Sequence, residues 1–294
     1  MNLAQLKDRA KNKENFVKID DYASFCRDYL EFVYSGLQAV IVSRNENNYR
    51  FFQYKEDGDF TITRPINSHL MLSAEDFDRA YQVFKSALPH MRDIRNDVEI
   101  RDIINKVVYT CQQSIGATLD ALPVGESNFA RKINGDLFER FIRTLISDVG
   151  INVREGTIRV PVIVDGEEQF CMNYQHDLII EENGTLKAIG SVKTSSKDRI
   201  DKVFIDKFLY NRLTDSDTPH FAVFLNDVQR KGREPNYGIN STFLTGHFKG
   251  YTVKLSPLDG VYYCDMRPNM YTDPLLRRNI RSLDYLLVED IWEF

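Results

Sequence analysis

The stretch GSVKTSSKDRIDKVFIDK, residues 190–207, is typical of a strand that runs directly into a helix. Apolar side chains recur at helical spacing from about residue 197 to 213, and we expect Ser195 or Ser196 to be the N-cap of that helix. Between residues 187 and 207, six basic less three acidic side chains leave a local charge of +3, whereas the whole chain has a net charge of −5. Packing alone does not require so many charges at a strand–helix junction.

The segments around this junction predict an α/β fold. The helix expected over residues 134–150 has an apolar stripe that consists of Leu137, Phe138, Phe141, Ile142, Leu145 and Ile146. Three strand-like runs follow it, and Asn183-Gly184 is a strong hairpin turn between the second and the third. The runs cover residues 157–164, 169–181 and 186–194. The next helix is followed by a short buried strand at 220–227, so the order is α-β-β-β-α-β. Residues 250–257 and 260–266 are expected to be further strands.

The first half of the chain has a different pattern of predicted secondary structure. It is mostly helical, with Ser73 as the N-cap of one helix and a β-hairpin around Asp57-Gly58. The segment LPVGESN, residues 122–128, is rich in turn residues and separates the two halves. We therefore expect a helical N-terminal region, residues 1–128, docked on an α/β core, residues 129–294.

Length and composition indicate a cytoplasmic globular protein. The chain has 294 residues, of which 43% are hydrophobic, with no apolar run long enough for a transmembrane helix and no apolar leader in its polar N-terminus. Its four cysteines show no CxxC spacing, so we expect free, mostly buried thiols and no zinc site. No P-loop is present, and no nucleotide cofactor is expected. The net charge argues against a protein that coats nucleic acid, but it is compatible with a local basic cleft.

Asp177 and Lys193 form the central candidate pair. They lie on the two strands joined by the Asn183-Gly184 turn, so both side chains can reach the same end of the sheet. A carboxylate and an ammonium group in this arrangement can hold Mg²⁺ and a water molecule, since Mg²⁺ prefers oxygen ligands and retains several waters. The metal lowers the pKa of a water and neutralises charge on a phosphate. This is the chemistry of phosphodiester hydrolysis.

The order of elements and the Asp177–Lys193 pair resemble the PD-(D/E)xK nuclease superfamily. The usual second acid is replaced by Ser191, and His176 stands where the superfamily has Pro. The motif is similar to that of type II restriction endonucleases of the SsoII, NgoMIV, PspGI and EcoRII branch, which read S-x-K and carry the missing acid in the following helix. Thirteen residues after Lys193 stands Asp206, where that branch has Glu. The branch also has a Glu on the helix that opens the core, and Glu139 occupies this place.

Lys197, Asp198 and Arg199 resemble the R-(E/D)-R cluster with which this branch reads consecutive C·G pairs, with Lys in place of the first Arg. The chemistry does not depend on the family. Arg or Lys donates to guanine O6 and N7, and Asp accepts from cytosine N4. A donor–acceptor–donor triplet can therefore address neighbouring G·C pairs in the major groove. Because this triplet follows Lys193 closely in the chain, base recognition would be coupled to cleavage of the phosphodiester bond.

The resemblance implies a Mg²⁺-dependent type II restriction endonuclease of PD-(D/E)xK fold, with a central mixed sheet flanked by helices. It would cut double-stranded DNA at a palindromic site that contains CC and GG, leave 5′-phosphates and act as a homodimer. Asp177, Asp206 and Glu139 would hold the metal, Lys193 would position the water, and Lys197, Asp198 and Arg199 would read the site. Two alternatives stay open, namely a nuclease of the same fold without sequence specificity and a DNA-binding protein with an inactive core.

Each residue also has a simpler interpretation. Glu139 could pair with Arg143 one helical turn away, and Asp206 could pair with Lys202 or Arg199. Lys193 could extend from a strand end to solvent. These interpretations do not account for the joint order and spacing of the motif.

Overall fold

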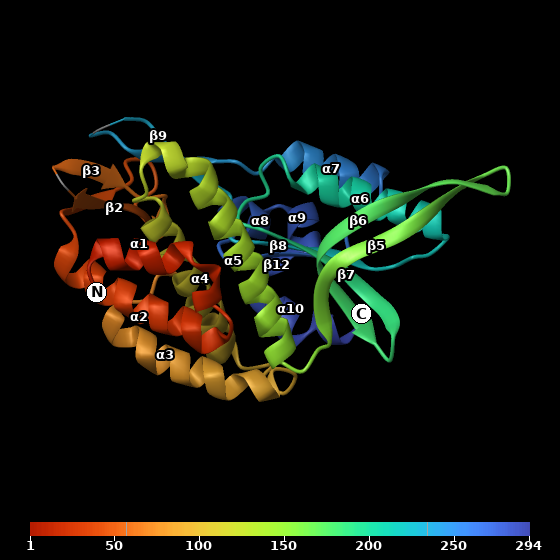
Figure 1. Cartoon of the computed structure of the whole chain (residues 1–294), viewed down its shortest axis with the longest axis horizontal. Helices are drawn as coiled ribbons and strands as arrows, with labels where there is room; N and C mark the ends of the chain where they lie inside the picture. Colours follow the sequence, from red (N-terminus) through yellow and green to blue (C-terminus); the bar gives the residue numbers. More distant parts are fainter. Residues whose placement is uncertain (57, 234) are drawn as a thin grey trace.

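A computed structural model of the chain describes residues 1–56, 58–233 and 235–294. Within these residues, the strands of the central sheet are β5 (Val153–Val164), β6 (Glu167–Glu182), β7 (Thr185–Lys193), β8 (His220–Phe224), β11 (Gly260–Tyr263) and β12 (Ile280–Ser282). Their order in space is β12-β11-β8-β7-β6-β5 (Figure 1). The pairs from β12 to β7 are parallel, whereas β6 pairs antiparallel with both β7 and β5. The predicted mixed sheet is therefore confirmed.

The described helices surround this sheet on both faces and form a separate group at the N-terminus. They are α1 (Leu3–Lys11), α2 (Ile19–Gly36), α3 (Ala74–Ala87), α4 (Val98–Leu119), α5 (Ser127–Asp148), α6 (Ile200–Thr214), α7 (Thr245–Lys254), α8 (Pro268–Thr272), α9 (Pro274–Asn279) and α10 (Leu283–Val288). The chain thus passes through α5, β5, β6, β7, α6 and β8 in the predicted α-β-β-β-α-β order. None of the described helices is long and apolar enough to cross a membrane.

The core has three layers because β8 is buried on both faces. Phe221 and Val223 belong to the hydrophobic cluster that also contains the apolar side of α5 and α10. Ala222 and Phe224 belong to a second cluster, formed with α6 and α7. Successive side chains of a strand point to opposite faces, so this alternation places α5 and α10 on one side of the sheet and α6 and α7 on the other. All six residues of the predicted α5 stripe are buried.

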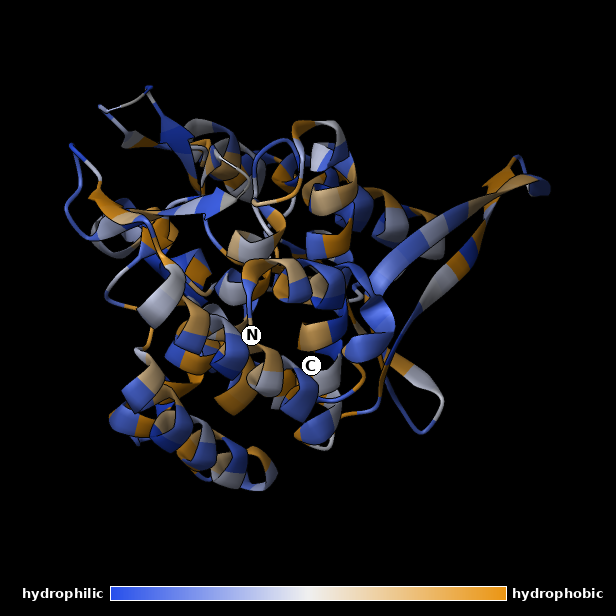
Figure 2. Ribbon diagram, turned by 60° about the vertical axis from the view of Figure 1, so that its left-hand side comes forward, coloured by the Kyte–Doolittle hydropathy of each residue, from blue (hydrophilic) through white to orange (hydrophobic). Residues whose placement is uncertain are grey.

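The antiparallel half of the sheet forms as the turn residues predict. Asn183 and Gly184 both have positive φ, 52° and 77°, as a tight hairpin between β6 and β7 requires. Beyond its base, the β5–β6 hairpin projects away from the body of the molecule (Figure 2). Its far end exposes Ile163, Val164 and Phe170.

The N-terminal region contains a small sheet in addition to its helices. The strands of this sheet are β1 (Ala39–Val42), β2 (Tyr49–Glu56), β3 (Asp59–Ile62) and β4 (Ile66–Asn67). β2 and β3 pair antiparallel, which confirms the hairpin, although Asp57 of its turn lies outside the described residues. One hydrophobic cluster runs from α1–α4 through α5 to the central sheet. The division at residue 128 stays a prediction.

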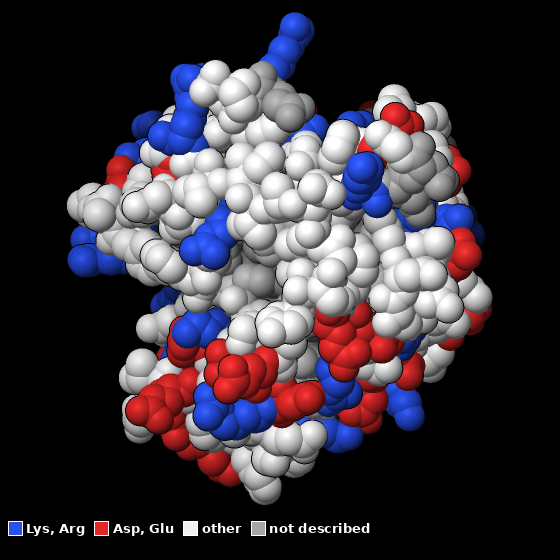
Figure 3. All heavy atoms as spheres, turned by 90° about the vertical axis from the view of Figure 1, so that its left-hand side faces the viewer, with Lys and Arg blue, Asp and Glu red and all other residues white. Residues whose placement is uncertain are grey.

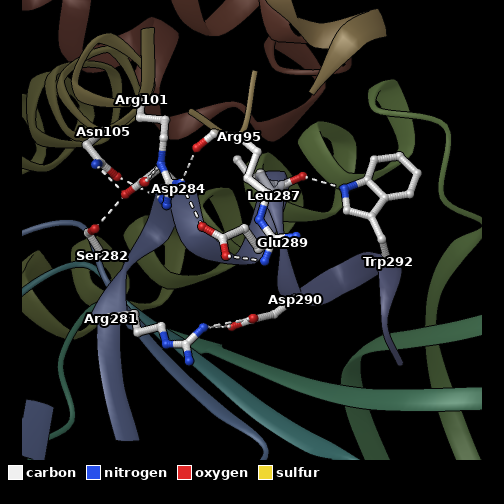
Figure 4. Close-up of polar contacts among 10 residues, drawn as sticks. All are labelled: Arg95, Arg101, Asn105, Arg281, Ser282, Asp284, Leu287, Glu289, Asp290 and Trp292. Atoms are coloured by element: carbon white, nitrogen blue, oxygen red, sulfur yellow. Dashed lines mark hydrogen bonds and ion pairs between the residues drawn. The ribbon is translucent and has the colours of Figure 1, made fainter. Parts of the chain in front are cut away.

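Polar contacts also join the N-terminal region to the C-terminal segment (Figure 4). Arg101 of α4 donates from Nε to Asp284 at 2.6 Å and from Nη1 to Glu289 at 2.6 Å. Asn105, one turn further along α4, donates to the other oxygen of Asp284 at 2.7 Å. The end of the chain is therefore fixed to a helix that lies far away in the sequence.

The structure corrects two boundaries. Residues 250–257, expected to be a strand, belong mostly to α7 and its C-terminal turn. The helix expected from residue 197 begins at Ile200, with Arg199 at the N-cap position, so neither Ser195 nor Ser196 is its cap. The four cysteines are free and three of them are buried, as expected.

Candidate active site

Lys193, at the end of β7, lies between two carboxylates. Its Nζ is 2.5 Å from Oδ2 of Asp177 on β6 and 2.8 Å from Oε1 of Glu139 on α5. The three side chains are 16–30% exposed, so the cluster is partly shielded and still open to a ligand. The structure thus brings together three of the four catalytic residues predicted from the sequence.

The position of Asp177 follows from the end of the β6–β7 ladder. The register of β6 and β7 ends with Leu178 opposite Gly190. Beyond this pair, the Asp177 carboxylate accepts the backbone N–H of Val192 at 2.8 Å and takes the place of a ladder hydrogen bond. Gly190 leaves room for the ring of Phe221 on β8, because a Cβ at residue 190 would lie 2.5 Å from that ring.

The pKa values of Glu139 and Lys193 are shifted by burial and by the neighbouring charges of the cluster. Burial raises the pKa of Glu139, and the nearby Asp177 carboxylate raises it further. Burial lowers the pKa of Lys193, but the two carboxylates outweigh this effect and raise it overall. Lys193 is therefore an ammonium group at neutral pH.

Glu139 does not form the ion pair with Arg143 that its simpler interpretation predicted. Arg143, its expected partner one turn along α5, has a guanidinium nitrogen 2.7 Å from Glu155 instead. Glu139 is left to contact Lys193, which comes from a different element. The carboxylate is therefore directed toward the candidate site.

Asp206 lies apart from this cluster. It is on α6 and forms an ion pair with Lys202 one turn earlier, as its simpler interpretation predicted. Among the described residues, no contact joins Asp206 to Asp177, Lys193 or Glu139. Its place among metal ligands stays a prediction.

Asp177 and Glu139 fit the binding of Mg²⁺ as a pair. In the described part of the chain, no three His, Cys, Asp or Glu side chains form a ready metal cluster. However, Mg²⁺ is commonly held by one or two carboxylates together with waters and substrate phosphates. Oxygen atoms of Asp177 and Glu139 already point toward one place, where both contact the Lys193 ammonium group. Two carboxylate oxygens directed at one point are the arrangement that a Mg²⁺ ion needs.

The three predicted DNA-reading residues, Lys197, Asp198 and Arg199, form a turn before α6 rather than its first helical turn, and we call them the recognition turn. All three are exposed. Asp198 has φ 55°, a left-handed conformation that interrupts the helix. Ile200 is buried directly after the turn and fixes the start of α6.

Asp227 holds the segment before the recognition turn, a role that the sequence analysis did not predict. Its buried carboxylate accepts the Ser196 N–H at 2.9 Å and the Ser196 hydroxyl at 2.7 Å. It also accepts the hydroxyls of Ser195, Thr242 and Tyr263. Burial raises the pKa of Asp227. The two serines expected to cap α6 are instead bound to this carboxylate. The sequence features that could have indicated this contact are the two adjacent serines before the turn and the acidic residue at the end of a buried strand.

The fold corresponds to that of a type II restriction endonuclease. No family model and no curated protein sequence matches this chain. Among solved structures, the crystal structure of the type IIP restriction endonuclease Kpn2I is similar over 99% of this chain and 97% of that chain. The TM-score is 0.72 and the sequence identity is 17%. At this identity the likeness establishes a common fold.

Proposed function

We propose that the protein is a type II restriction endonuclease that cuts double-stranded DNA at a palindromic site containing CC and GG. The observation that carries this proposal is the contact of Lys193 with both Asp177 and Glu139, a few residues before an exposed Lys-Asp-Arg turn. The likeness to Kpn2I over nearly the whole chain supports it at the level of the fold.

Asp177 and Glu139 would hold Mg²⁺, with Asp206 as a further predicted ligand. The metal would supply charge neutralisation at the scissile phosphate and a more acidic water. Because Lys193 carries a positive charge, it would act as a donor that orients the attacking water or a phosphate oxygen, and not as a base. Attack of water at phosphorus breaks the bond to O3′ and leaves a 5′-phosphate and a 3′-hydroxyl.

The recognition turn would read the site. Lys197 and Arg199 can donate to guanine O6 and N7, and Asp198 can accept from cytosine N4. A palindromic site has twofold symmetry, so two copies of the chain would each cut one strand. The proposed homodimer can be tested by sedimentation with and without a duplex.

The decisive experiment is digestion of a plasmid of known sequence with and without Mg²⁺, followed by mapping of the ends. We expect discrete, Mg²⁺-dependent fragments with CC/GG at every cut and 5′-phosphate ends. Lys193→Ala should lower the cleavage rate at least about 100-fold, the usual cost of one such donor, while DNA binding is kept. A smear would favour a nuclease without sequence specificity. Binding without any cleavage would indicate an inactive core.

A further inference from the structure

A second hairpin lies beside the recognition turn. It consists of β9 (Val228–Lys231) and β10 (Gly238–Ser241), which pair antiparallel. The Nζ of Lys197, in the recognition turn, donates to Oε1 of Gln229 on β9 at 3.4 Å. The hairpin and the turn therefore present neighbouring side chains to the same space, although the whole of α6 and of β8 separates them in the chain.

The two faces of this hairpin differ in chemistry. Val228 packs in a cluster with residues of the N-terminal sheet, and Arg230 on the same face donates to the backbone oxygen of Ile62 at 2.8 Å. Because side chains alternate along a strand, Gln229 and Lys231 point to the opposite face. Asn240 is the register partner of Gln229 and is exposed like it. This open face therefore carries two amides and one ammonium group.

The same buried carboxylate fixes the hairpin and the recognition turn relative to each other. Asp227 directly precedes β9, and Thr242, which follows β10, donates to it. The backbone N–H of Thr242 also donates to the Asp227 carbonyl at 3.0 Å. On its other side, the Asp227 carboxylate holds Ser195 and Ser196. The two elements are therefore positioned as one rigid unit.

The surface charge agrees with a nucleic-acid partner at this end of the molecule. Figure 3 shows the face on the left of Figure 1, where Asp and Glu gather in the lower half and Lys and Arg predominate above, toward β9. An antiparallel two-stranded ribbon fits the major groove of B-DNA, and basic side chains on it attract the phosphates.

We propose that the open face of the β9–β10 hairpin is a second DNA-reading element, in which Gln229 contacts adenine in the base pair next to the one read by Lys197. The inference rests on the proposed function and extends it to the flanking base pairs. A glutamine amide donates to adenine N7 and accepts from N6. Its carbonyl oxygen has two lone pairs, so it can accept from Lys197 and from adenine together. Lys231 contacts a phosphate and adds affinity without sequence preference.

The test compares wild-type protein with Gln229→Ala on a duplex library randomised around a CC/GG centre, by sequencing of the cut ends. We expect wild-type cut sites to share an A·T pair that flanks CC/GG. Gln229→Ala should keep the CC/GG requirement, accept any flanking pair, and cut the original site about 5- to 150-fold more slowly, the discrimination of one bidentate contact. Gln82→Ala, an exposed glutamine of α3, is the matched control and should change neither property.

The remaining outcomes separate the two proposals. If Gln229→Ala keeps the flanking preference and the rate, or if wild-type sites have no A·T preference, the hairpin is not the reader and the inference fails while the nuclease proposal stands. If wild-type protein does not cut, the library is selected by gel shift without divalent metal. Enrichment of A·T that Gln229→Ala loses would then support the inference alone, and the lack of such enrichment would overturn it.

Lys231→Ala gives an independent check of the same face. It should weaken binding about equally on all sequences and reduce the slope of log affinity against log salt concentration by about 1. An unchanged salt slope would contradict a phosphate contact at Lys231.

Discussion

Lys193 contacts two carboxylates that come from different elements, Asp177 from β6 and Glu139 from α5. The sequence placed Asp177 and Lys193 on adjacent strands, and the hairpin turn between them made their proximity predictable. The contact of Glu139 with Lys193 follows only from the packing of α5 on the sheet, so its support from the sequence was the resemblance alone. The pKa values of both Glu139 and Lys193 are raised, and ionisable groups with shifted pKa values gather at functional sites.

Asp206 is the residue for which the sequence and the structure give different partners. If it joins the metal ligands when DNA and Mg²⁺ bind, Asp206→Ala should lower cleavage about 10-fold or more at limiting Mg²⁺, and higher Mg²⁺ should restore part of the rate. Lys202→Ala, which removes only its ion-pair partner, should leave the Mg²⁺ requirement unchanged. Cleavage rates over a Mg²⁺ titration provide the measurement. An equal effect of both variants would assign Asp206 a structural role.

Secondary-structure elements were predictable where apolar periodicity and turn residues agreed. The stripe of α5, the buried strand β8 and the Asn183-Gly184 hairpin are confirmed for this reason. The errors arose where tertiary contacts overrode local preference. Residues 250–254 alternate like a strand, but the helix begins upstream at Thr245 and buries Phe248 against Phe204. Likewise, Ser195 and Ser196 donate hydrogen bonds to Asp227 and do not cap α6. Asp227 lies about thirty residues further along the chain, so no local sequence pattern indicates this contact.

The connection from β7 to α6 depends on Asp227, because its carboxylate accepts five hydrogen bonds. Asp227→Asn replaces one acceptor oxygen by a donor group, so it should cost about 1–3 kcal/mol of unfolding free energy. It should also reduce cleavage at the proposed CC/GG site more than it reduces binding to unrelated DNA, because the recognition turn would lose its attachment to Asp227. Tyr263→Phe removes one donor and keeps the carboxylate, so it should have a smaller effect on specificity. Equal loss of specific cleavage and unspecific binding would contradict the positioning role.

At the scale of the whole molecule, Asp265 joins the N-terminal region to the core. It follows β11 and accepts hydrogen bonds from Tyr49 at 2.9 Å and Asn67 at 2.8 Å. Burial raises the pKa of Asp265 from 3.8 to about 6. The folded state therefore binds this proton more tightly than the unfolded state, and the resulting stability is present below about pH 4 and lost as the pH rises through 6.

This linkage predicts the effect of Asp265→Asn, which resembles the protonated carboxyl group. Between pH 4 and pH 7, the unfolding free energy of the variant should rise relative to wild type by about 3 kcal/mol, the value of a two-unit pKa difference. Urea unfolding of both proteins at several pH values measures the difference. A difference that does not vary with pH would show that Asp265 keeps an ordinary pKa in the folded protein.

The C-terminal segment is attached to α4 by a different kind of contact, in which Arg101 bridges Asp284 and Glu289 (Figure 4). The Arg101 side chain is 11% exposed and that of Asp284 is 4% exposed. Arg101→Ala leaves a buried carboxylate without its cationic partner, so we expect a loss of about 3–5 kcal/mol of unfolding free energy. Arg95 also contacts Glu289, but it is 63% exposed, and Arg95→Ala should cost under about 1 kcal/mol. Denaturant unfolding of the two variants measures both values. Similar losses would mean that burial does not strengthen the Arg101 contact, and that the C-terminal segment is held mainly by the apolar side of α10.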